Sequence, residues 1–235
     1  MIYALPSAER ARLTHAIRAA LAVPFIAGVE GYIWEAIFHY VKGFPLPDPH
    51  AVLRKKLLFD AVNAQGGIGW SLKAVQKNPK VGAMFEVVIQ RADVLKKRVA
   101  LGFPKLTLDA SPQIIGAAVL KHWQGKIALD AHAQQVRHAR IALLLKSRDH
   151  RQYALLEQDL AQYAKNELVW SWTDQTRTGL QASHKETREV VYRWYPNQKQ
   201  LFEVFTLDPE SFRFEVDSTR LDASAFVEMI SGLSK

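Results

Sequence analysis

The sequence contains no cysteine among its 235 residues. The chain can therefore form neither disulfide bonds nor thiolate metal sites, and its composition is compatible with a reducing compartment. It also lacks an uninterrupted apolar run of the ~20 residues that a membrane-spanning helix needs. Three arginines, Arg10, Arg12 and Arg18, interrupt the first apolar stretch, so we expect no signal peptide. These absences predict a soluble, cytoplasmic protein with no membrane association.

Acidic side chains are fewer than basic ones. The 23 Asp and Glu residues stand against 31 Lys and Arg residues, which gives a net charge of +8 and an isoelectric point near 9.6. The excess lies within residues 1–151, whereas residues 201–235 are net acidic. A basic surface suits a polyanionic partner such as nucleic acid, and an ordinary solvated basic face is the simpler alternative. The 49% hydrophobic content is enough for a folded core, which excludes global disorder.

Hydrophobic periodicity predicts a mixture of helices and strands. Helices are expected at about 7–23, 28–41 and 111–137. Strands are expected at about 56–63, 67–76, 84–90 and 141–145, and then at 168–173, 190–194, 201–207 and 212–216. Residues 153–164 are ambiguous. We expect an α+β or α/β fold with a mixed central β-sheet flanked by helices over residues 1–165, and a β-rich part over residues 166–235 packed on it.

The segment from Asp60 to Lys73 carries the most informative chemistry. An acid stands near the end of one expected strand, a glycine-rich turn follows, and the next expected strand contains Ser71 and Lys73. Because side chains alternate along a strand, Ser71 and Lys73 share one face. In phosphodiester cleavage, carboxylate oxygens hold a divalent cation such as Mg²⁺, and a lysine can orient water and offset developing charge. The Asp60–Lys73 hairpin is therefore a candidate metal-dependent nuclease site.

A second carboxylate is missing from the hairpin, because position 71 is serine. The expected helix 28–41 offers Glu35, which stands among Trp34, Ile37 and Phe38 at the boundary of the apolar stripe. From that boundary Glu35 can point toward a sheet edge. Glu30 on the same segment is the alternative second acid.

This order of elements resembles the PD-(D/E)xK nuclease superfamily. An acid-bearing helix precedes Asp60, a short turn follows, and the next strand ends in x-Lys; the phrase Gly69–Lys73 is similar to type II restriction endonucleases whose second acid has moved to the preceding helix. The likeness covers about residues 28–90. Ser71 occupies the position that usually holds Glu, Asp or Gln in that superfamily, and Phe59 stands where a proline usually precedes the acid.

The resemblance implies a Mg²⁺-dependent endonuclease core that leaves a 5′-phosphate and a 3′-hydroxyl. Asp60 and Glu35, with the backbone carbonyl of Leu72, would bind the metal, and Glu30 is the alternative to Glu35. Lys73 would orient or activate the attacking water, beside Ser71. The expected restriction-endonuclease-like core would occupy the mixed central sheet.

Two further groups of residues are candidates for DNA binding. Residues 173–189 form an expected loop rich in long side-chain donors, which suit base edges in the major groove, although an ordinary polar loop is the alternative. Basic residues of the segment 121–151 would face DNA phosphates from a basic helix, and a solvated helix face is the equal alternative. The loop candidates are Arg177, Gln181, Lys185, Arg188, Gln175 and His184, and the phosphate candidates are Lys121, Lys126, Arg137 and Arg140.

These features together predict a sequence-specific type II restriction enzyme that acts on double-stranded DNA. A homodimer is expected, because its two-fold symmetry matches that of a symmetric DNA site. A cognate DNA methyltransferase would then be encoded nearby. The alternatives are a structure-specific repair or recombination nuclease, and a non-catalytic DNA-binding protein with a degenerate nuclease fold, for which Ser71 is the main support.

Overall fold

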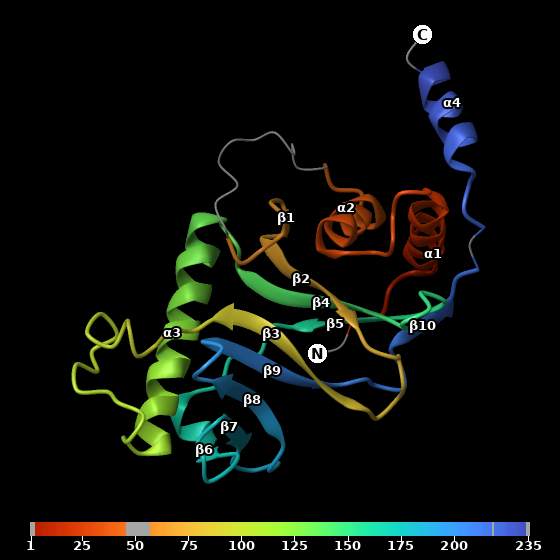
Figure 1. Ribbon diagram of the computed structural model, residues 1–235. Coiled ribbons are helices and arrows are strands. Elements are labelled where there is room, and N and C mark those ends of the chain that lie inside the picture. Colours follow the sequence, from red (N-terminus) through yellow and green to blue (C-terminus); the bar gives the residue numbers. More distant parts are fainter. Residues whose placement is uncertain (1–2, 46–56, 218, 234–235) are drawn as a thin grey trace. The chain divides into compact units, whose positions relative to one another are not determined.

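The computed structural model describes residues 3–45, 57–217 and 219–233. These residues form an α+β fold with four α-helices and two five-stranded sheets, one mixed and one antiparallel (Figure 1). The chain divides into two compact units, each assembled from separate stretches of sequence. Unit 1 comprises Met1–Gly82, Gln134–Leu160 and Leu207–Lys235, and unit 2 comprises Ala83–Ala133 and Ala161–Thr206.

Unit 1 is built on the mixed sheet, whose strand order is β1-β2-β4-β5-β10. Strands β2 and β4 run parallel, and the other neighbouring strands are antiparallel. A parallel pair needs a long crossover, and the chain between β2 and β4 includes the first segment of unit 2. The strands are β1 (Ala61–Asn63), β2 (Ile68–Gln76), β4 (His138–Lys146), β5 (Gln152–Asp159) and β10 (Phe212–Glu215).

Two helices, α1 (Ser7–Ala22) and α2 (Gly31–Lys42), cover one face of this sheet (Figure 1). Their buried side chains form one core with Trp70 and Leu72 of β2. Because side chains alternate along a strand, Ser71 and Lys73 lie on the opposite face of β2. The third helix of unit 1 is α4 (Ala223–Leu233).

Unit 2 contains the antiparallel sheet, with strand order β3-β9-β8-β7-β6, and the helix α3 (Pro112–Ala133). Gly116 of α3 lies against Trp170, and a Cβ atom at this position would come within 2.2 Å of the indole ring. The close approach of helix and sheet therefore requires glycine here. The strands are β3 (Met84–Arg91), β6 (Leu168–Trp172), β7 (Leu180–His184), β8 (Val190–Tyr195) and β9 (Gln200–Thr206), and a short 3₁₀ helix, η1 (Lys165–Glu167), precedes β6.

The structure confirms the α+β class and most expected elements, with their ends shifted by a few residues. The strand expected at 56–63 is shorter in the structure, where β1 begins at Ala61. Residue 56, the first residue of the expected strand, lies outside the described residues. The ambiguous segment 153–164 contains most of β5, and α4 was not predicted. The two compact units also differ from an expected division after residue 165, because β10 pairs with β5 and β3 pairs with β9 across long sequence separations.

Two expectations about the basic segments are wrong. The helix expected to reach residue 137 ends at Ala133, where Gln135 adopts a left-handed conformation (φ 56°) that is common just after a helix. Arg137 is therefore outside the helix, and Arg140 belongs to β4. The loop expected at 173–189 contains the strand β7, which divides it into two turns.

None of the helices in the described ranges is long and apolar enough to cross a membrane.

Candidate functional site

The hairpin of β1 and β2 brings Asp60, Ser71 and Lys73 together. The Lys73 ammonium donates to the Ser71 hydroxyl at 2.9 Å and to the Leu72 carbonyl oxygen at 3.0 Å. The same ammonium lies 3.8 Å from Oδ2 of Asp60. The side chains of Asp60 and Lys73 retain 24% and 29% of their exposure, so a ligand in solvent can reach both.

Asp60 is held by the backbone of the neighbouring strand. Its N–H donates to the Trp70 carbonyl at 2.8 Å, and its Oδ2 accepts from the Leu72 N–H at 2.7 Å. Strand β1 begins only at Ala61, so the ladder between β1 and β2 stops near this point. The carboxylate supplies the acceptor that a longer β1 would have provided, which fixes its position beside Lys73.

The turn of the hairpin is shaped by Gly67, whose φ of 62° is left-handed. Its carbonyl accepts from the N–H groups of Arg137, at 2.7 Å, and His138, at 3.0 Å. A Cβ atom at Gly67 would lie 2.6 Å from Nε of Arg137. Both the turn geometry and this close contact therefore favour glycine, and Arg137 is placed beside the turn of the candidate site.

Helix α2 approaches Asp60 through His39, a residue that is not among the candidates predicted from the sequence. The buried imidazole has Nε2 at 3.2 Å from the Asp60 carbonyl oxygen and Nδ1 at 2.7 Å from the Pro45 carbonyl oxygen. Glu35 lies four residues earlier and is half-buried. Residues four apart share a side of a helix, so Glu35 lies on the same side of α2 as His39. Helix α2 packs on the face of β2 that carries Trp70 and Leu72, opposite to that of Ser71 and Lys73. This i, i+4 spacing is the signal that could have identified His39.

Glu30, the alternative second acid, has a different partner. Its Oε1 lies 2.7 Å from the ammonium of Lys146, which also donates to the Val29 carbonyl oxygen at 2.9 Å. Lys146 is buried, so this ion pair satisfies a charge inside unit 1 at the start of α2. Glu30 is therefore held at Lys146 and not at the hairpin.

The oxygens around Lys73 are of the kind that Mg²⁺ binds. They are the Asp60 carboxylate, the Ser71 hydroxyl and the Leu72 carbonyl, and all three face the same ammonium. No group of three or more His, Asp or Glu side chains in the described residues could hold a metal by itself. The hairpin therefore offers a mixed oxygen set of one carboxylate, one hydroxyl and one carbonyl, in which the Lys73 ammonium now lies.

The expected base-reading residues fall into two groups in unit 2. Gln175 and Arg177 lie in the turn between β6 and β7, whereas Lys185 and Arg188 lie in the turn between β7 and β8. The five residues of β7 place these turns roughly 15 Å apart. A single continuous reading loop over 173–189 is therefore wrong. All four side chains are exposed.

Some members of these groups already have partners within unit 2. Arg177 donates to Asp109 at 2.9 Å and to the Leu108 carbonyl at 3.1 Å. Gln181 lies on β7 opposite Ser171 and Arg193. His184 ends β7, where its ring lies 5.8 Å from that of Tyr163, and its Nδ1 accepts from the Thr187 N–H.

The expected phosphate-binding residues also separate. Lys121 and Lys126 lie on α3, the first with its ammonium 5.9 Å from the Phe103 ring and the second paired with Asp130. Arg137 is exposed beside Gly67. Arg140 is only 18% exposed and lies 3.4 Å from the Glu157 carboxylate, so it is not a surface phosphate contact.

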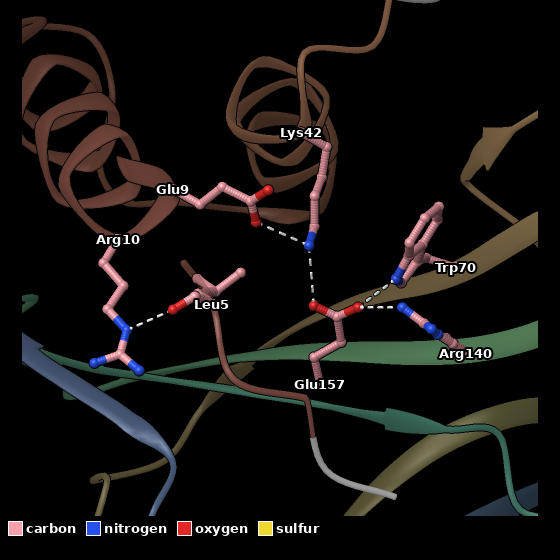
Figure 2. Close-up of polar contacts among 7 residues, drawn as sticks. All are labelled: Leu5, Glu9, Arg10, Lys42, Trp70, Arg140 and Glu157. Atoms are coloured by element: carbon pink, nitrogen blue, oxygen red, sulfur yellow. Dashed lines mark hydrogen bonds and ion pairs between the residues drawn. The ribbon is translucent and has the colours of Figure 1, made fainter. Parts of the chain in front are cut away.

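Arg140 belongs to a polar network in the interior of unit 1 (Figure 2). Glu157, whose side chain is 2% exposed, accepts from Trp70 Nε1 at 2.7 Å and from the Lys42 ammonium at 3.2 Å. Lys42 also pairs with Glu9 at 3.0 Å. The Arg140 guanidinium lies 3.6 Å from the centre of the Tyr3 ring. These contacts satisfy a buried carboxylate and connect α1 and α2 to the sheet, which is a structural role.

No protein-family model matches the chain, and comparison with curated proteins and with solved structures gives no match either. A function for this chain therefore depends on the geometry of the Asp60–Lys73 hairpin and on the charge of the molecule.

Proposed function

We propose that the chain is a Mg²⁺-dependent DNA endonuclease, of the sequence-specific type II restriction kind. The observation that carries this proposal is the convergence of three oxygens, from Asp60, Ser71 and Leu72, on the Lys73 ammonium. An arrangement that holds one cation among oxygen ligands at an accessible hairpin suits an exchange between lysine and a divalent cation. The net charge of +8 supports a polyanionic substrate.

The protein groups would have distinct roles in phosphodiester hydrolysis. Asp60, Glu35 and the Leu72 carbonyl would hold Mg²⁺, and Ser71 would add a neutral oxygen beside them. The bound metal would supply Lewis-acid stabilisation of the phosphate. Lys73 would orient the attacking water and offset the negative charge that develops in the transition state, giving a 5′-phosphate and a 3′-hydroxyl.

Each unit carries exposed residues that are proposed to contact double-stranded DNA. Arg137, whose N–H donates to Gly67 in the hairpin turn, would contact a phosphate near the site. Lys185 and Arg188, together with Gln175 and Arg177, would contact DNA from the two turns of unit 2. A homodimer would match a symmetric DNA site, and a methyltransferase encoded nearby would protect that site in the host.

A non-catalytic DNA-binding protein is the second candidate function. Ser71 favours it, because the hairpin then holds a single carboxylate, and the Oδ2 atom of that carboxylate already accepts from the Leu72 N–H. In this alternative the basic residues would bind DNA, and the Asp60–Lys73 pair would only stabilise the hairpin. A structure-specific nuclease would share the chemistry proposed here and differ in the DNA it selects.

Plasmid cleavage separates these functions. The wild-type protein is expected to cut plasmid DNA with Mg²⁺ and not with EDTA, and discrete products would indicate sequence recognition. Asp60→Ala, Glu35→Ala and Lys73→Ala should each reduce cleavage at least 100-fold, because each removes a metal ligand or the water-orienting cation. Lys77→Ala, which removes an exposed lysine just after β2, should cleave like the wild type.

DNA binding by the same variants, measured by a mobility shift with Ca²⁺ in place of Mg²⁺, provides the control. Retained binding with lost cleavage supports the catalytic assignment. Equal cleavage by wild type and the three site variants would show that this site is wrongly assigned. Metal-independent binding with no cleavage by any protein would favour the DNA-binding alternative.

A further inference from the structure

Among the described residues, strand β10 lies at the end of its sheet and has a neighbouring strand on one side only. It pairs with β5 on one side only, and it ends the sheet among the described residues. A groove of about 580 Å³ lies at this strand, lined by the six consecutive residues 210–215, by Arg10 and Pro79, and by Gln152 and Tyr153 of β5. An accessible strand edge presents unpaired backbone N–H and C=O groups to a partner strand.

The backbone groups of β10 that point away from β5 can be assigned from the pairing between the two strands. The Val216 N–H donates to the Arg151 carbonyl at 2.8 Å, so this pair exchanges hydrogen bonds with β5. Bonded and non-bonded pairs alternate in an antiparallel ladder, which gives Phe214 and Phe212 the inner hydrogen bonds. The N–H and C=O groups of Arg213 and Glu215 therefore point outward.

The side chains of β10 alternate in the same way. Phe212 and Phe214 stack on each other with ring centres 4.8 Å apart, and Phe214 stacks on Tyr153 at 5.5 Å. Arg213 and Glu215 are exposed and share the opposite face. Glu215 accepts from the Gln152 amide at 3.3 Å, which holds its carboxylate over the sheet. The strand thus has a basic side chain just before Phe214 and an acidic side chain just after it.

This pattern is complementary to itself. In an antiparallel pair of two β10 strands centred on Phe214, Arg213 of each copy lies directly opposite Glu215 of the other. The outward N–H and C=O groups of Arg213 in one copy then meet those of Glu215 in the other copy, and the two residues form a hydrogen-bonded pair. The same register therefore satisfies the backbone hydrogen bonds between the two β10 strands and places two pairs of opposite charges across from each other. Such cross-strand pairs favour strand pairing.

We propose that a second copy of this chain binds to the β10 edge, forming a two-fold dimer with one continuous ten-stranded sheet. The contact is isologous, because the same strand is used by both copies. A four-residue strand pair is smaller than a standard stable interface, so the dimer forms reversibly and depends on protein concentration. This inference does not depend on the nuclease proposal.

Charge reversal tests this register directly. Sedimentation velocity over a range of concentrations should show a monomer–dimer equilibrium for the wild type. Arg213→Glu should place two acids opposite each other, and Glu215→Arg should place two bases opposite each other, so each should weaken dimerisation at least 10-fold. The double variant Arg213→Glu/Glu215→Arg restores opposite charges and should recover most of the wild-type affinity.

Arg18→Glu, an exposed charge reversal on α1, is the matched control and should dimerise like the wild type. Far-ultraviolet circular dichroism establishes that each variant is folded. A wild type that stays monomeric at every concentration overturns the proposal, and so does dimerisation that both single reversals leave unchanged.

Cross-linking supplies a second readout, because the chain has no cysteine of its own. In the proposed register, Phe214 faces Phe214 of the second copy as a non-hydrogen-bonded pair, where Cα atoms lie about 4.5 Å apart. Phe214→Cys should therefore form a disulfide-linked dimer under mild oxidation, whereas Arg18→Cys should not. Equal cross-linking of the two variants would contradict the register.

Discussion

At the scale of single residues, Glu203 is a buried acid in unit 2 with a strongly raised pKa. It lies on β9 opposite Tyr192 and Val87, and only 3% of it is exposed. Burial raises its pKa from 4.5 to about 8, and its Oε2 has no hydrogen-bond partner in the described part of the chain. Burial, with a smaller contribution from Glu203, also raises the pKa of Tyr192. The interior of unit 2 therefore favours a protonated Glu203.

This burial predicts a stability that falls with rising pH. Between about 4.5 and 8, the folded chain holds a proton on Glu203 that the unfolded chain has released, so the free energy of unfolding decreases across that window. Its contribution is full below pH 4.5 and is lost once pH exceeds 8. In Glu203→Gln the loss should be smaller, because glutamine does not titrate. Urea unfolding of the wild type and Glu203→Gln at pH 5, 7 and 9 measures the difference.

Glu186→Gln, an exposed position in the turn after β7, is the control and should keep the pH dependence of the wild type. If Glu203→Gln loses stability as steeply as the wild type between pH 5 and 9, Glu203 is not the source of that dependence.

At the scale of single elements, α3 shows how one helix carries two kinds of glycine. Gly116 faces Trp170, where an added Cβ atom would overlap the indole ring at 2.2 Å. Gly125 lies on the same helix with open space around its Cα. The sequence pattern predicts the helix but does not distinguish these positions, because the difference is set by what packs on each face.

Alanine substitution at the two glycines should have opposite effects. Gly116→Ala should lower the free energy of unfolding by about 1–3 kcal/mol, because the methyl group forces α3 away from the sheet of unit 2. Gly125→Ala should raise it by about 0.5–1 kcal/mol through better helix propensity. Thermal or urea unfolding compares them. A stabilised Gly116→Ala would contradict the close packing of α3 on β6.

At the scale of the whole molecule, the basic charge serves two different purposes. Some basic side chains are exposed and available to a polyanion, such as Arg137 beside the hairpin turn. Others neutralise acids inside unit 1, as Arg140 and Lys42 do around Glu157 (Figure 2). Net charge therefore overstates the number of residues that can contact DNA.

This distinction predicts different responses in DNA binding. If the chain binds DNA as proposed, Arg137→Ala should reduce the slope of log K against log salt by about one, as expected for the loss of one phosphate contact. Arg140→Ala should leave that slope unchanged and instead lower the free energy of unfolding by roughly 1–3 kcal/mol, because Glu157 loses a donor. Fluorescence anisotropy at several salt concentrations, together with urea unfolding, provides both measurements. A reduced slope for Arg140→Ala would contradict its structural role.

The local parts of the fold and site were predictable from the sequence. The helices near residues 7–22 and 31–42 follow from the spacing of apolar residues, and the meeting of Asp60 with Lys73 follows from a short hairpin. The strand at 152–159 was ambiguous, because its apolar run has no clear period. Strand β7 was not predicted, because its segment is rich in polar residues and shows no apolar pattern. Its conformation depends on pairing with β6 and β8.

The sequence by itself determined the absence of cysteine chemistry, the basic charge and the Asp60–Ser71–Lys73 grouping, since each depends on composition or on neighbours along the chain. Only the tertiary structure decided that Glu30 binds Lys146, that Arg140 points at Glu157, and that the expected reading loop is two separate turns. It also decided that β10 pairs with β5 and is the last strand of its sheet in the described part of the chain. These outcomes depend on contacts between residues far apart in the sequence, which hydrophobic periodicity does not encode.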